Sequence, residues 1–244
     1  MPTAFEEITL GYKVASLALE IGRSAGNQVK SWKNKSNHRF ISSMTTLEIT
    51  YDAGADQIAH YVQDRTVKIT RDGVRMPPFT YGSDGTDTFG DITVVVNQRT
   101  TTYRHRILEE DGREKTIGTE VDRDYAKDTI VRCVLTAVSR NGFPADEESL
   151  ITSVQDWTDM STTFVIFPKE KLPKELEITF RKMGDDTWRQ VTREKNELRQ
   201  FTGGKKAFIL EATNPPTGQK YKIAWRWSAG RTLGDSACCA FVYH

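Results

Sequence analysis

The loop at residues 82–91 holds the residue types best suited to chemistry. Asp84, Asp87 and Asp91 lie there among glycines and threonines. Carboxylate oxygens grouped in this way can ligate calcium, although their spacing does not match the calcium loop of helix–loop–helix proteins. Three interpretations follow: a plain hairpin or mobile loop, a calcium site, and a contact loop for a partner. In the third, Asp84 and Asp87 are the expected partner contacts.

An enzyme would need ionisable side chains gathered in one cleft, and the candidates are Asp84, Asp87, His105 and Asp124. No nucleophile elbow, phosphate loop, dinucleotide fingerprint or His-Glu-x-x-His motif occurs in the chain. The cysteines and histidines also lack the spacing of metal ligands. The sequence therefore assigns no catalytic residue, no cofactor-binding residue and no metal ligand.

An aromatic run near the C-terminus, Tyr221 to Trp227, has the alternation of a strand. Tyr221, Ile223, Trp225 and Trp227 share one face of that strand, and Lys222 and Arg226 lie on the other. Large rings on one face are typical of a buried core. The same face with a nearby arginine also suits partner binding or stacking on nucleic-acid bases. Trp225 and Trp227 are therefore both core candidates and candidate partner contacts.

Charge and composition argue against several classes of protein. The 34 Lys and Arg residues balance 33 Asp and Glu residues, so the basic excess of a duplex-DNA binder is missing and no nucleic-acid partner is expected. No stretch reaches the roughly 18 apolar residues of a membrane span, and the first residues do not resemble a signal peptide. Three cysteines, two of them adjacent, do not form a disulfide framework. We therefore expect a cytoplasmic protein with reduced thiols.

The N-terminal residues predict an amphipathic helix. Thr3 and Glu6 have the spacing of a capping box, and a narrow polar stripe leaves a wide apolar face. That face can pack on the chain's own β core, dock into a protein partner or a second copy, or lie on a membrane surface. For docking, the expected contacts are Leu10, Val14, Leu17 and Ile21.

From residue 44 the hydrophobic period changes to two, which predicts β-strands. A connector is expected at 33–43, a central strand at 130–137 and a short helix beginning at 145–149. The fold class is mainly β, with one or two antiparallel, immunoglobulin-like β-sandwich modules after the helix. The expected strands cover 47–51, 67–69, 92–96, 101–108, 130–137, 163–167, 176–181, 207–212 and 221–227.

The predicted organisation has three parts: the helix and connector at 1–43, a first sandwich at 44–158 and a second at 159–244. Leu47 to Tyr51 recurs weakly as Leu176 to Phe180. Such an echo favours duplication of one module, although a match of this length also arises by chance.

Four segments carry a resemblance to a known group of proteins. They are Gly142-Phe143-Pro144, Val154 to Trp157, Phe164 to Pro168 and Tyr221 to Trp227. Together they resemble paired β modules in accessory proteins of bacterial signalling and conflict systems, over residues 44–227. The resemblance implies a non-catalytic sensing or interaction module and carries over no functional residue.

The leading hypothesis from the sequence is a non-catalytic protein-interaction or sensing module of a bacterial signalling or defence system. Its partner, or a second copy of the chain, would bind through the N-terminal helix. One alternative is an enzyme with an unrecognised loop-borne site. The other is a membrane-active protein that uses the N-terminal helix.

Overall fold

The computed structural model divides the chain into two units, residues 1–35 and 36–244. The structure describes only part of the second unit, as follows: 36–52, 56–83, 85–111, 114–121, 123–143, 145–191, 198–200 (backbone only) and 204–227. The predicted N-terminal helix, with Leu10, Val14, Leu17 and Ile21, lies outside the described residues. Asp84, Cys238 and Cys239 lie outside them as well.

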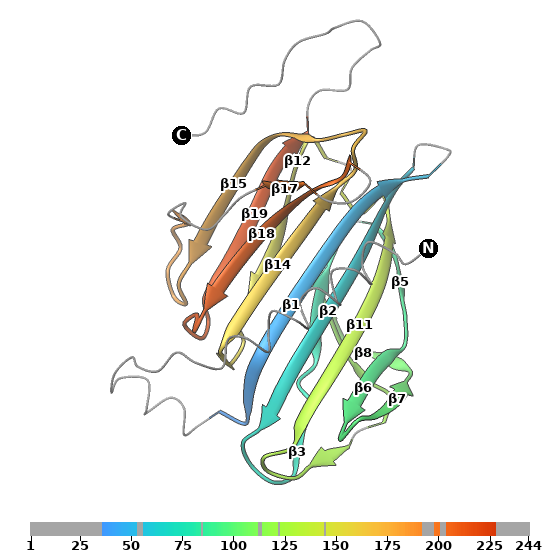
Figure 1. Ribbon diagram of the computed structural model, residues 1–244, viewed down its shortest axis with the longest axis vertical. Coiled ribbons are helices and arrows are strands. Elements are labelled where there is room, and N and C mark those ends of the chain that lie inside the picture. The colour runs from blue at the N-terminus through green and yellow to red at the C-terminus, as the bar shows by residue number, and fades with distance from the viewer. Residues whose placement is uncertain are drawn as a thin grey trace, which may run out of the picture. The chain divides into compact units, whose positions relative to one another are not determined.

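The largest sheet has ten strands, and its main path runs β17-β18-β14-β1-β2-β11-β6-β7. Two further strands lie off this path, because β13 pairs with β1 and β5 pairs with β11. Figure 1 shows β14, β1, β2 and β11 side by side in this order. The strands are β1 (His38–Tyr51), β2 (Gln57–Ile69), β5 (Thr86–Phe89), β6 (Ile92–Val96), β7 (Arg99–Tyr103), β11 (Ile130–Arg140), β13 (Trp157–Thr158), β14 (Met160–Phe167), β17 (Leu198–Gln200) and β18 (Lys206–Thr213).

Three smaller sheets complete the described part of the chain. A four-stranded sheet has the order β12 (Glu147–Ser153), β19 (Lys220–Trp227), β15 (Pro173–Arg181) and β16 (Arg189–Gln190). A three-stranded sheet has the order β4 (Phe79–Gly82), β9 (Glu114–Thr119) and β8 (His105–Asp111). A two-stranded sheet joins β10 (Asp124–Tyr125) to β3 (Val74–Arg75). The prediction of a mainly β protein is confirmed.

Alternating side chains explain why these segments are strands. Along β11, Val131, Cys133, Leu135 and Ala137 are buried, while the residues between them are less buried. One face of the strand thus faces the core and the other does not. β11 lies between β2 and β6, which confirms the predicted central strand at 130–137.

Two pairings of β1 differ from the antiparallel sheets that the sequence predicts. β1 runs parallel to β13 and β14, whereas the other pairs in the described residues are antiparallel. Parallel neighbours are joined by long connections, and here the connection from β1 to β14 contains the strands β2 to β13. The ten-stranded sheet therefore takes strands from both sides of the predicted boundary at 158/159.

Two local predictions are wrong. The segment at 38–43, predicted as a connector, is the first part of β1, where a bulge between Phe40 and Ser42 accommodates an irregular pattern. The predicted short helix at 145–149 is replaced by β12, whose residues pair with β19 from Glu147 to Ser153. Pairing within the sheet outweighs the weak strand preference of the two glutamates there.

Aromatic rings join the ten-stranded and four-stranded sheets. Phe167 of β14 contacts Trp225 and Trp227 of β19, with centroid distances of 5.7 and 5.8 Å and edge-to-face geometry. Trp225 is only 1% exposed, and Phe143 packs on it at 5.5 Å. The aromatic run at 221–227 is thus a core face, as the first of its three interpretations predicts.

Candidate functional site

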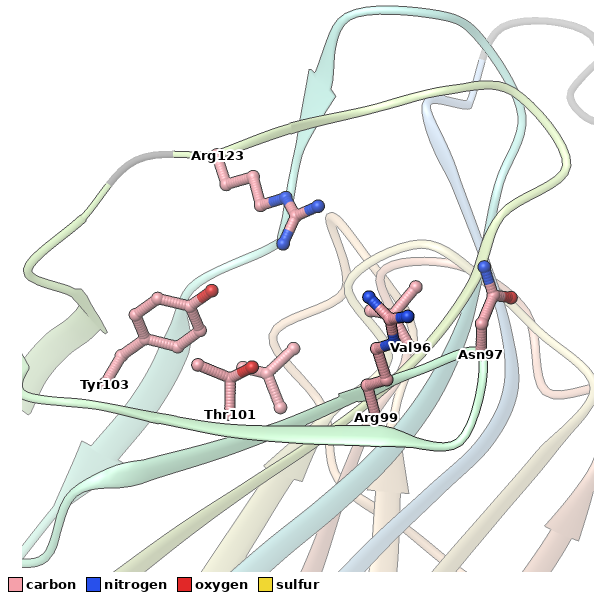
Figure 2. Close-up of a pocket in the computed structure, with 7 residues that line it drawn as sticks. Val96, Asn97, Arg99, Thr101, Tyr103 and Arg123 are labelled. Carbon is pink, nitrogen blue, oxygen red and sulfur yellow. The ribbon is translucent and has the colours of Figure 1, made fainter.

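A cavity of about 490 Å³ lies beside the β6–β7 hairpin. The hairpin supplies most of its lining, and Arg123, just before β10, supplies the rest. Figure 2 shows the side chains that face this space. We call it the arginine pocket, and its lining consists of Val94, Val96, Asn97, Arg99, Thr101, Tyr103 and Arg123.

A tight turn fixes the hairpin that forms the pocket. Asn97 and Gln98 have φ values of 48° and 65°, which are those of a type I′ turn. This turn matches the twist of paired strands, and asparagine tolerates positive φ better than most residues. The turn sets the register, so that Val96 lies opposite Arg99 and Val94 opposite Thr101. Residues that lie opposite each other project to the same side of the hairpin. Arg99 therefore lies over an apolar floor formed by Val94 and Val96.

The walls of the pocket carry hydrogen-bond donors above buried valine. Val94 is 3% exposed and forms part of the core. Arg99, Thr101 and Tyr103 alternate along β7 and therefore project to the same side. In Figure 2 the guanidinium of Arg123 reaches from the opposite segment toward this row, and the Tyr103 hydroxyl points into the same space.

The pocket is positively charged. None of the residues that line it is acidic. Among the described residues, no carboxylate forms an ion pair with Arg99 or Arg123, and the recorded contact of Arg123 is with the Tyr125 ring at 5.6 Å. Each guanidinium offers five N–H donors in a planar fork that matches a carboxylate or phosphate. This arrangement can bind an anionic group.

Asp87, the described member of the predicted loop pair, lies in a different cluster and is buried. Its side chain is 2% exposed, and Lys115 of β9 pairs with it at 2.9 Å. The Tyr81 hydroxyl donates to Asp87 Oδ1 at 3.0 Å, and the Ser83 hydroxyl donates to the same oxygen. Asp87 is therefore held inside the protein by its neighbours.

The environment of Asp87 favours its charged form. Burial alone raises the pKa of Asp87, but hydrogen bonds from Lys115, Ser83, Ser139 and Tyr81 outweigh burial and hold the pKa below its usual value. In turn, the hydrogen bond to Asp87 raises the pKa of Lys115. A carboxylate with a lowered pKa is a weak general base, so this cluster suits structure better than proton transfer.

The other residues considered for catalysis are dispersed. His105 of β8 packs against Phe89 at 5.7 Å, and Asp124 of β10 pairs with Arg75 at 3.5 Å. None of the recorded contacts of Asp87, His105 and Asp124 joins one of them to another. Trp225 and Trp227, the other predicted partner contacts, are buried at 1% and 4% exposure.

Two further properties concern the described residues alone. No group of three or more His, Cys, Asp or Glu side chains among them is arranged to hold a metal ion. No helix among them is long and apolar enough to cross a membrane.

Comparisons with known proteins do not assign the chain to a family. No family model and no curated protein matches it. Among solved structures, a "putative nutrient binding protein" from Legionella pneumophila has a TM-score of 0.44 and 10% identity, over 78% of this chain and 67% of that one. A "putative protease" from Parabacteroides distasonis has a TM-score of 0.46 and 8% identity, over 78% of this chain and 40% of that one. Likenesses this distant carry no argument about function.

The sequence did not reveal the arginine pocket. Arg99 lies on β7 and Arg123 lies just before β10, two segments that pair with different strands. No motif of fixed spacing joins the two arginines. The 101–108 strand predicted there is in fact two strands, β7 and β8, divided at Arg104. The available signal was the alternation of Arg99, Thr101 and Tyr103 next to a row of valines.

Proposed function

We propose that this chain is a non-catalytic binding module that recognises an anionic ligand through the arginine pocket. The observation that carries the proposal is the convergence of Arg99 and Arg123 on one cavity, with no carboxylate partner among the described residues. Arginines are usually accompanied by acidic side chains, backbone carbonyls or water. Two of them facing one space leave donors for a ligand.

Binding suits the pocket better than catalysis does. Its lining has no carboxylate, imidazole or thiol that could serve as a general base or nucleophile. The apolar floor at Val94 and Val96 would contact the aliphatic part of a ligand while the guanidiniums contact its charge. A few polar groups above an apolar floor are typical of small-ligand sites.

The test is a titration of the ¹⁵N-labelled protein with inorganic phosphate, followed through the arginine Nε–H signals by NMR. We expect saturable shifts for Arg99 and Arg123. Arg99→Gln and Arg123→Gln should each weaken binding about tenfold or more, the effect of losing a charge-assisted hydrogen bond of roughly 1.5 kcal/mol. Arg106→Gln removes the same charge from an exposed position on β8 and should leave the affinity within about twofold.

Equal weakening by all three variants would indicate a diffuse charge effect and would contradict the proposal. Shifts that grow linearly without saturation would contradict it as well.

The proposal also includes three predictions made from the sequence. They are the role in a bacterial signalling or defence system, the partner contact through the N-terminal helix and the cytoplasmic location. The contacts of Phe167 with Trp225 and Trp227 support a fourth, an arrangement in which two sheets pack as a sandwich.

A further inference from the structure

The strand that lines the arginine pocket is also the edge of the ten-stranded sheet. β7 ends the strand order and pairs only with β6 among the described residues. An edge strand has a row of backbone groups that a further strand can pair with. Three of the five residues of this edge strand, Arg99, Thr101 and Tyr103, therefore also line the pocket.

The turn determines which backbone groups face outward. In a two-residue type I′ hairpin, the residues flanking the turn form a hydrogen-bonded pair, and hydrogen-bonded pairs then alternate along the strands. Val96 and Arg99 flank the turn, so the backbone groups of Arg99, Thr101 and Tyr103 face β6. The N–H and C=O groups of Thr100 and Thr102 face away from it. No described residue forms a backbone hydrogen bond with them.

Apart from the charge of Arg99, β7 has none of the usual features that prevent a strand from being added, as far as the described residues extend. Proteins protect edges with prolines, lysines, bulges or a covering segment. β7 reads Arg-Thr-Thr-Thr-Tyr, has no proline or lysine, and its register with β6 has no shift. Its β-branched threonines favour an extended backbone.

We propose that the ligand of the arginine pocket is an extended acidic peptide that adds to β7 as a further strand; this inference rests on the proposed function. Residues of the added strand that lie opposite Arg99, Thr101 and Tyr103 would project to the pocket side. An acidic side chain opposite Thr101 lies between Arg99 and Tyr103, on the side that Arg123 approaches. Backbone pairing supplies affinity, and the pocket selects alternate side chains.

Charge argues for an acidic peptide over a second copy of the chain. A second β7 would bring its own Arg99 to the same face and has no carboxylate to offer the two guanidiniums. Like charges placed together at such an interface are unfavourable.

The experiment uses the full chain and a fluorescein-labelled eight-residue peptide that alternates valine with glutamate. The variant Thr102→Pro removes one outward N–H group and leaves the inward pairing and both arginines in place, since proline is tolerated on the outer side of an edge strand. Thr102→Val, the matched control, changes the same side chain and keeps the N–H group. Inorganic phosphate is titrated into every variant in parallel.

We expect Thr102→Pro to weaken peptide binding at least tenfold, Thr102→Val to change it less than twofold, and phosphate binding to be the same in both. A peptide with glutamine in place of glutamate should bind at least tenfold more weakly. The amide protons of Thr100 and Thr102 should exchange more slowly when the acidic peptide is bound.

Normal phosphate binding with no peptide binding, or with peptide binding that Thr102→Pro leaves intact, overturns this inference and leaves the proposed function standing. Failure of phosphate to bind the unaltered protein overturns the proposed function, and the choice of an acidic peptide with it. A dimer seen by light scattering and lost in Thr102→Pro would assign the edge to a second copy and overturn the inference.

Discussion

Asp87 keeps a negative charge inside the protein because donors from several elements reach it. Tyr81 lies on β4, Lys115 on β9 and Ser139 on β11. A buried carboxylate is costly unless it is paired and hydrogen-bonded, and here it is both. The cluster therefore ties two sheets together through a single charged side chain.

Asp87→Asn should lower the free energy of unfolding at pH 7 by about 2–4 kcal/mol, because Lys115 then loses its partner at 2.9 Å and keeps the more distant Glu110, at 3.6 Å. The folded state lowers the pKa of Asp87. Its stabilising contribution is therefore present above the unfolded pKa of about 3.9 and is lost as the pH falls through the folded value. The difference between the two proteins should shrink from pH 5 to pH 2 in urea titrations. Asp91→Asn, an exposed change in the same loop, should leave the pH dependence of the free energy of unfolding unchanged. If the Asp87→Asn protein shows the same pH dependence as the unaltered protein, Asp87 is not the group responsible.

Arg65 is a second buried charge, and no carboxylate of the described residues forms an ion pair with it. Its guanidinium donates to the Pro78 carbonyl at 2.8 Å and to the Gln63 side chain at 3.0 Å, and it lies 4.6 Å from the centre of the Phe79 ring. Burial lowers the pKa of Arg65. The planar fork of arginine lets one side chain reach two acceptors while its face contacts an aromatic ring.

At the scale of elements, β5 depends on a glycine for its approach to β11. A Cβ atom on Gly85 would lie 2.3 Å from the carbonyl oxygen of Arg140 and 2.8 Å from the Cα atom of Gly142. Both are backbone atoms, so a rotamer change cannot relieve the contact. The next residue, Thr86, pairs with Arg140 of β11.

Gly85→Ala should therefore move β5 away from β11 and lower the free energy of unfolding by about 2 kcal/mol or more, as overpacking does. Urea unfolding measures the loss, and hydrogen exchange should show faster exchange of the β5 amides. Thr88→Ala, an exposed change within β5 itself, should stay within about 0.5 kcal/mol of the unaltered protein. If the two variants behave alike, the close approach does not control the position of β5.

The sequence predicts individual strands better than their partners. Period-two alternation is a local signal, and it identifies β6 and most of β11 and β19 because one face of each is buried. It misses β12, where glutamates conceal the pattern. It also contains no information on the parallel pairing of β1 with β14, which depends on contacts between distant residues. The pairing of Asp87 with Lys115 and the convergence of Arg99 and Arg123 are missed for the same reason.

At the scale of the whole molecule, the shared sheet couples the two predicted modules. β1 lies between β2 and β14, so that unfolding either part exposes an edge of the other. Thr162 to Phe167 are all buried, which makes β14 part of the core on both of its faces.

We expect the described part of the chain to unfold in one transition. Cys133, which is fully buried, can report on the first predicted module through its reaction with a thiol reagent in a protein with Cys238→Ser and Cys239→Ser. Burial raises the pKa of the Cys133 thiol to about 12, which adds to its protection in the folded state. Fluorescence of Trp225 and Trp227 reports on the second once Trp32, Trp157 and Trp188 are replaced by phenylalanine. The two urea curves should coincide, and separate midpoints would show that the modules fold independently.

The parallel pairing of β1 also has a consequence for synthesis. A ribosome that has finished β1 must add residues 52–159 before the first residue of β14 emerges. Until then, the nascent chain can pair β1 with β2, but the backbone N–H and C=O groups on the opposite edge of β1 have no neighbouring strand. Such an edge can pair with another nascent chain. The yield of folded protein should therefore depend on how quickly translation reaches β14.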